Sequence, residues 1–148
     1  MYSFVGCEEF LHSFEGVLET VAQLSSKYQI GVITNWNDEG EQWNKLRHLG
    51  LETYVQHVVV SGSVGYEKPD RRIFQHALTL TGVDAREAIF VGDRLDVDVA
   101  GAQAAGMKAV WFNHWGGAVD GSAIMPDVII TRFGELPAAI EGISNRQS

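Results

Sequence analysis

An apolar run that ends in Gly92-Asp93, with a second carboxylate at Asp98, is the part of the sequence best suited to chemistry. A short apolar run closed by glycine is typical of a buried parallel strand. We therefore expect Asp93 to leave the sheet at its carboxyl edge, where open α/β sheets bind ligands. Two carboxylates there favour Mg²⁺, which takes oxygen ligands and usually needs only one or two protein carboxylates. The alternative is that Asp93 caps a solvated helix with an acidic first turn, because aspartate is also a favoured N-cap.

Two further segments carry side chains suited to phosphate. An apolar strand is predicted near 29–34, and it ends in Thr34-Asn35, whose hydroxyl and amide can donate to a phosphate oxygen. Thr34 would equally serve as a helix cap. Lys68 follows the apolar run at 57–61, where its compact charge would lie beside a phosphoryl group, although a lysine before proline also suits solvated surface. Because all three segments fall near the carboxyl ends of strands, we interpret them as one phosphate site.

Together these segments resemble three of the four motifs of the haloacid dehalogenase-like (HAD) hydrolase superfamily, from about Phe14 to about Ile140. Ile33-Thr34-Asn35 resembles the second motif. The third motif is matched by residues 67–70 with 73–74, and the fourth by residues 91–93 and 98–102 with 105–107. The resemblance implies an α/β fold with a doubly wound parallel sheet, a HAD-like Rossmannoid core, in a single domain over residues 1–148.

The resemblance also implies roles for the site residues. Thr34 and Lys68 would orient and neutralise the transferring oxygens, with Asn35 beside them as a third catalytic residue. Asp93 would hold Mg²⁺ directly, and Asp98 would bind it through water or orient its shell. Phosphoryl transfer depends mainly on positioning and on neutralising spread-out negative charge, and a divalent ion supplies both.

The superfamily's first motif, Asp-x-Asp-x-Thr, has no counterpart in the sequence. Its first aspartate attacks phosphorus to form an aspartyl-phosphate, and its second acts as general acid and base. The only Asp-x-Asp here is Asp96-Val97-Asp98, which is followed by Val99-Ala100 and belongs to the fourth motif. We therefore expect phosphate binding to survive, and turnover by this chain alone to be absent or very weak, because the attacking group is missing.

The same resemblance implies a gap in the sheet. In the family fold the nucleophile strand lies between the strand ending at Thr34 and the strand ending before Asp93, so the central strand and most of the cap should be missing. Unpaired buried backbone groups cost about 1 to 3 kcal/mol each. We expect that the flanking strands pair directly, that a homodimer or a strand-donating partner fills the gap, or that the chain is a fragment. Residues 1–13 would be a cap remnant or a helical lead-in.

The coarse pattern alternates helices and strands. Helices are predicted near residues 14–26, 39–49, 71–81, 97–105 and 133–143. Strands are predicted near residues 29–34, 57–61, 88–91, 108–112 and 127–130. Gly50, Gly82 and Gly106 follow helical patterns where a left-handed cap is wanted. Strands that alternate with helices form a parallel, doubly wound sheet.

The composition and charge of the chain argue against several classes of binding partner. A net charge of −8 with 11 scattered basic residues argues against nucleic-acid binding. Neither a signal peptide nor a membrane span is indicated, and Cys7 is the only cysteine, so we expect a cytoplasmic protein. The five histidines lack ligand spacing such as His-x-x-x-His, so zinc is not expected. Trp36 directly follows Thr34-Asn35 and should overhang the phosphate site.

Two function classes remain. The first is a Mg²⁺-dependent phosphomonoester phosphatase of small phosphorylated metabolites, complete only if an upstream segment or another chain supplies the aspartate. The second is a non-catalytic relative that keeps a phosphate and metal pocket for binding or assembly. A haloacid dehalogenase proper is disfavoured, because those members work without metal and lack the Gly-Asp-x-x-x-x-Asp pattern.

Overall fold

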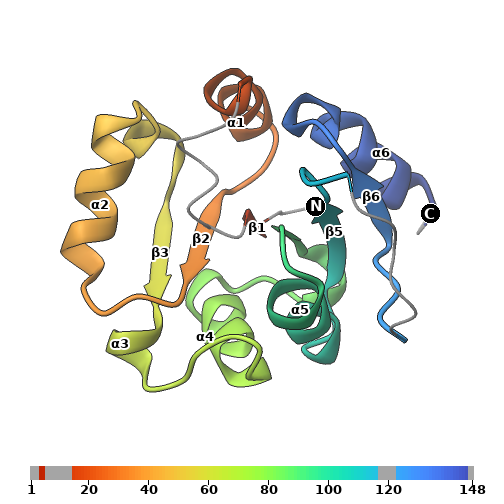
Figure 1. Ribbon diagram of the computed structural model, residues 1–148. Coiled ribbons are helices and arrows are strands. Elements are labelled where there is room, and N and C mark those ends of the chain that lie inside the picture. The colour runs from red at the N-terminus through yellow and green to blue at the C-terminus, as the bar shows by residue number, and fades with distance from the viewer. Residues whose placement is uncertain (1–3, 6–14, 117–122, 147–148) are drawn as a thin grey trace.

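Parallel strands form the middle of the molecule, and helices lie around them (Figure 1). The computed structural model describes residues 4–5, 15–116 and 123–146. The strands are β1 (Phe4–Val5), β2 (Gly31–Thr34), β3 (His57–Val60), β4 (Ile89–Gly92), β5 (Lys108–Phe112) and β6 (Val128–Ile130). They pair in the orders β1-β4-β5-β6 and β2-β3. Each pairing is parallel, which confirms the predicted α/β class with a parallel sheet.

The helices mostly lie where the sequence predicts them. They are α1 (Val17–Ser25), α2 (Glu39–His48), α3 (Ser61–Val64), α4 (Arg71–Thr81), α5 (Ala100–Ala104) and α6 (Leu136–Arg146). A π-helical turn, Leu95–Val99, precedes α5. Single 3-10 turns lie at Glu52–Tyr54, Ala85–Glu87 and Phe133–Glu135. Gly50, Gly82 and Gly106 all have positive φ, as predicted.

The sheet is buried on both faces, which explains why its strands are continuous apolar runs. Neighbouring residues of a strand point to opposite faces, and the two core clusters follow that alternation. Val32 belongs to the cluster beneath α1, α2 and α6, whereas Ile33 belongs to the cluster beneath α4 and α5. In β4, Val91 belongs to the same cluster as Val32, and Phe90 belongs to the same cluster as Ile33. Helices on both faces make the fold doubly wound, as predicted.

The predicted gap in the sheet is filled by the chain itself. Phe4 and Val5 of β1 pair in parallel with Phe90 and Val91 of β4, and β1 lies beside β2 on its other side (Figure 1). The prediction that the flanking strands β2 and β4 pair directly is therefore wrong. β1 supplies backbone partners to β4, whereas no strand pairing joins β1 to β2 among the described residues, and the predicted homodimer or strand-donating partner stays a prediction. The predicted cap remnant or lead-in at residues 1–13 otherwise lies outside the described residues.

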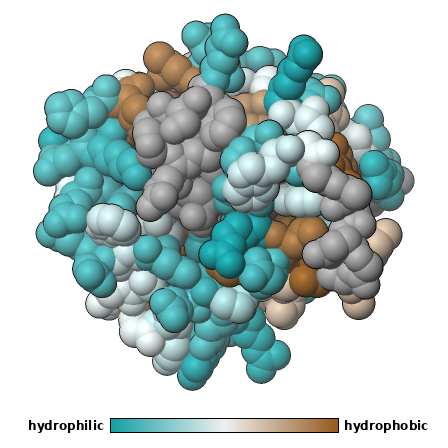
Figure 2. Space-filling view, viewed as in Figure 1, coloured by the Kyte–Doolittle hydropathy of each residue, from teal (hydrophilic) through white to brown (hydrophobic). Residues whose placement is uncertain are grey.

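Most large apolar side chains of the described residues lie in these two clusters. The face shown in Figure 2 is mainly hydrophilic, with small separate apolar areas. Among the helices that the structure describes, none has both the length and the apolar character that crossing a membrane requires.

Candidate phosphate and metal site

The predicted site residues follow the carboxyl ends of parallel strands. Thr34 is the last residue of β2 and is paired with Val60, the last residue of β3. Asp93 directly follows β4. No strand pairing joins β2 to β4 among the described residues, and the two segments are linked instead by side chains: Asn35, next to Thr34, bonds to Lys68, and Lys68 pairs with Asp98 in the turn after β4. Thr34 is buried.

Asn35 holds the Lys68 loop in place. Its Nδ2 donates to the Lys68 carbonyl oxygen at 3.0 Å, and its Oδ1 accepts from the Lys68 backbone N–H at 2.8 Å. Both ends of the amide are therefore bound to the backbone of one residue, which is 33 positions away in sequence. The sequence predicts that this amide donates to a phosphate oxygen, whereas in the structure it binds the Lys68 backbone.

Lys68 and Asp98 form a buried ion pair. Lys68 Nζ lies 2.7 Å from Asp98 Oδ1, and both side chains are 0% exposed. Asp98 Oδ2 also accepts from the Arg94 backbone N–H at 3.2 Å. A buried charge is tolerated only when it is paired and hydrogen-bonded. Gly92 is required beside this pair, because a Cβ there would overlap the Asp98 side chain.

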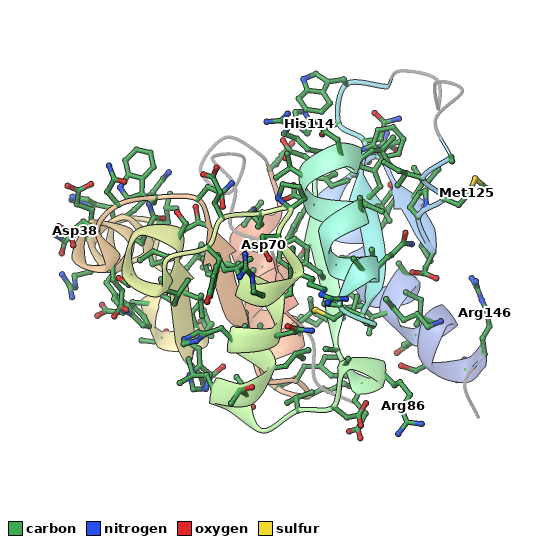
Figure 3. The ribbon with its side chains drawn as sticks, turned by 90° about the horizontal axis from the view of Figure 1, so that it is seen from below. Asp38, Asp70, Arg86, His114, Met125 and Arg146 are labelled. Carbon is green, nitrogen blue, oxygen red and sulfur yellow. The ribbon has the colours of Figure 1, made fainter. Side chains whose placement is uncertain are left out.

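Asp93 is held from β5 and the residues after it. Trp111 Nε1 donates to the Asp93 carbonyl oxygen at 3.0 Å, and His114 Nε2 lies 3.1 Å from Asp93 Oδ2. The Asp93 side chain is 13% exposed and that of His114 is 14% exposed. His114 is labelled in Figure 3, on the segment that follows β5. Asp93 thus presents a partly accessible carboxylate at the sheet edge.

The number of carboxylates at the site, Asp93 and Asp98, fits a magnesium ion. Mg²⁺ needs only one or two carboxylates, with water and phosphate oxygens at its other positions. Asp93 suits direct binding, whereas both Asp98 oxygens already accept N–H donors, so Asp98 suits the indirect role. Within the ranges 4–5, 15–116 and 123–146, no group of three or more His, Cys, Asp or Glu could hold a metal ion.

Trp36 lies at the rim of a polar pocket beside the site. The pocket has a volume of about 180 Å³ and is lined by Asn35, Trp36, Asn37, Ser61 and Glu67. Trp36 is 42% exposed, and its Nε1 donates to Glu41 Oε2 at 2.7 Å. The position supports the prediction that Trp36 lies close to the site, since its neighbour Asn35 contacts the Lys68 loop.

Sequence reasoning missed the part that β5 plays. The histidine spacing argues only against zinc, and the sequence pattern assigns no role to His114 or Trp111. The signal lay in the strand order: β4 and β5 are neighbours, and Gly92 is paired with Trp111. The residues that follow the two strands must therefore lie close together, although they are far apart in sequence.

Residues 5–112 match the family model described as haloacid dehalogenase-like hydrolase. The chain belongs to this family. HAD membership explains why the three strand-end segments occur in this order, and it confirms the resemblance inferred from the sequence. It does not test the roles of individual residues.

Curated relatives of the HAD core are named as phosphatases. The chain is 40% identical to a glyceraldehyde 3-phosphate phosphatase of Pyrococcus furiosus over 106 residues, covering 71% of this chain and 44% of the relative. It is 33% identical to the N-acylneuraminate-9-phosphatase of Rattus norvegicus over 135 residues, covering 90% of this chain and 54% of the relative. The chain thus spans about half the length of these relatives.

Solved HAD structures share the fold. A 2-haloacid dehalogenase from Pseudomonas syringae pv. Tomato DC3000 superposes with a TM-score of 0.78 at 37% identity, covering 90% of this chain and 57% of that one. The HAD hydrolase YfnB from Bacillus subtilis, solved with bound magnesium, superposes with a TM-score of 0.77 at 25% identity, covering 83% of this chain and 54% of that one.

Proposed function

We propose that this chain is the core of a Mg²⁺-dependent phosphomonoester phosphatase that acts on small phosphorylated metabolites. The observation that carries the proposal is the series of contacts from Asn35, next to Thr34, to Lys68, and from Lys68 to Asp98, which lies in the turn that follows Asp93. The phosphatase names of the relatives support the reaction class, and the magnesium-bound neighbour supports the ion.

The chain's own residues would act mainly by positioning charge. Asp98 fixes the Lys68 ammonium, and Asn35 fixes the backbone of the same residue, so this cation cannot move away from the sheet edge. Thr34 would donate its hydroxyl to a phosphoryl oxygen. Asp93 would hold Mg²⁺, which supplies further neutralisation of the phosphoryl oxygens when it is bound.

The attacking group would have to come from outside these 148 residues, because the sequence contains no Asp-x-Asp-x-Thr. Phosphoryl transfer through a covalent intermediate requires a nucleophile in line with the leaving oxygen. We expect the chain alone to bind phosphate and Mg²⁺ and to turn over an aryl phosphate very slowly or not at all.

A non-catalytic HAD relative is the second candidate, and the absent first motif is the observation that favours it. Incubating the purified chain with Mg²⁺ and p-nitrophenyl phosphate tests this second candidate. Turnover that disappears in Asp93→Asn would exclude the non-catalytic relative. Zero turnover with retained Mg²⁺ and phosphate binding agrees with both candidates, because both lack the nucleophile in this chain.

Metal dependence separates both candidates from a haloacid dehalogenase. Turnover of a 2-haloacid in the presence of EDTA would contradict the proposal, whereas the absence of such turnover together with Mg²⁺ binding would agree with it. A cytoplasmic location and a homodimer also stay predictions. Light scattering of the purified chain after size-exclusion chromatography would test the dimer.

A further inference from the structure

The pair formed by Asp93 and His114 has a defined hydrogen-bond direction. An ionised carboxylate can only accept, so the His114 Nε2 atom, 3.1 Å from Asp93 Oδ2, must carry the proton. The contact joins the residue after β4 to a residue beyond β5, 21 positions later. It is therefore a tertiary contact that the strand order creates, and not a local turn.

The imidazole ring is held by two aromatic neighbours. Its centroid lies 5.2 Å from that of Phe112 and 4.1 Å from that of Trp115. Phe112 is buried and packs edge-on against Phe133, with ring centroids 5.7 Å apart. Through Phe112, the orientation of His114 is thus tied to the hydrophobic core.

Asp93 is held at two points by the same segment. Trp111 fixes its backbone carbonyl and His114 fixes one oxygen of its carboxylate, so both the chain position and the side-chain rotation are set by residues of β5 and its continuation. With Oδ2 bound to the imidazole, Oδ1 is the oxygen left to meet an ion. Ligating carboxylates are commonly oriented in this way by hydrogen-bond donors that do not touch the metal.

We propose that His114 is a positioning residue that fixes the Asp93 carboxylate for its magnesium ion, an inference that rests on the metal site of the proposed function. Loss of such a partner typically lowers metal affinity by about 10- to 100-fold. A purely structural His114 would instead change the stability of the loop and leave the Mg²⁺ affinity of the folded protein unchanged.

Two substitutions separate these roles. His114→Phe keeps an aromatic ring between Phe112 and Trp115 but removes the N–H donor. His114→Gln keeps an amide N–H donor but removes the ring. A positioning role predicts that the Mg²⁺ dissociation constant rises by about 10-fold or more in His114→Phe and by clearly less in His114→Gln.

The measurement is isothermal titration of Mg²⁺ into the purified chain, with thermal unfolding in EDTA recorded for every variant. His76→Ala, on the exposed face of α4, is the matched histidine control and should titrate like the wild type. Equal dissociation constants for His114→Phe and the wild type, with binding lost in Asp93→Asn, would overturn the positioning role alone. A wild-type chain that binds no Mg²⁺ would overturn the metal site and this inference with it.

Discussion

Each aspartate of the candidate site is paired with a basic side chain, and the two pairs differ in their exposure to water. Lys68 and Asp98 are 0% exposed and 2.7 Å apart, whereas Asp93 and His114 are 13% and 14% exposed and 3.1 Å apart. The charges of the first pair lie inside the core, so removing either partner would leave an unpaired buried charge and destabilise the fold. The second leaves a carboxylate within reach of a ligand. Asp98 therefore mainly holds Lys68 inside the core, whereas Asp93 is the aspartate that a ligand can reach.

Breaking the buried pair should have the largest effect. Asp98→Asn leaves the Lys68 ammonium buried beside a neutral amide, and such a loss typically costs about 3 to 5 kcal/mol of folding free energy. Guanidinium denaturation measures it. The double variant Lys68→Met/Asp98→Asn should recover part of the loss, because the unpaired charge is then gone. A loss below about 1 kcal/mol in the single variant would show that the pair is solvated.

Gly92→Ala tests the packing around the same pair. The added Cβ would overlap the Asp98 side chain, so the pair or the strand end must shift, at a typical overpacking cost of about 1 to 3 kcal/mol. Gly134→Ala is the matched control, because a Cβ there meets nothing within 4 Å. Equal denaturation midpoints for the two variants would contradict the close approach of Gly92 to Asp98.

The smallest effect is expected at Asp70, whose partly exposed side chain is 31% accessible. Hydrogen bonds from the Arg72 side chain, and then from its backbone N–H, lower the pKa of Asp70 from 3.8 to about 2. Because the folded-state pKa is the lower one, the stabilisation is present above pH 3.8 and is lost as the pH falls towards 2. Asp70→Asn should therefore flatten slightly the decline in melting temperature between these values, and an unchanged decline would contradict the pairing.

The elements that the sequence predicted best are those with local signals. The predicted helix 71–81 matches α4: Gly82 ends it with φ 71°, as predicted, and the structure shows Asp70 capping its start. The region predicted as one helix from Val97 to Ala105 is instead a π-helical turn followed by α5. In that turn the Arg94 carbonyl accepts from both Asp98 and Val99, while the Asp98 side chain turns inward to Lys68. A distant partner sets this geometry, so periodicity could not reveal it.

The sequence predicts which residues belong to the candidate site better than it predicts the contacts that they make. Strand-end positions identified Thr34, Lys68 and Asp93, since the carboxyl edge of a parallel sheet follows from alternation alone. Asn35 binding the Lys68 backbone could not be foreseen, because it depends on how the two loops meet. The same holds for β1, since two residues are too short for any periodic signal.

The central claim is that Asp93 holds a magnesium ion that binds a phosphoryl group. Calorimetric titration of inorganic phosphate into the chain, with and without saturating Mg²⁺, tests it most directly. We expect phosphate to bind more tightly when Mg²⁺ is present and Asp93→Asn to remove that difference. Phosphate binding that is independent of Mg²⁺ and unchanged in Asp93→Asn would contradict the account.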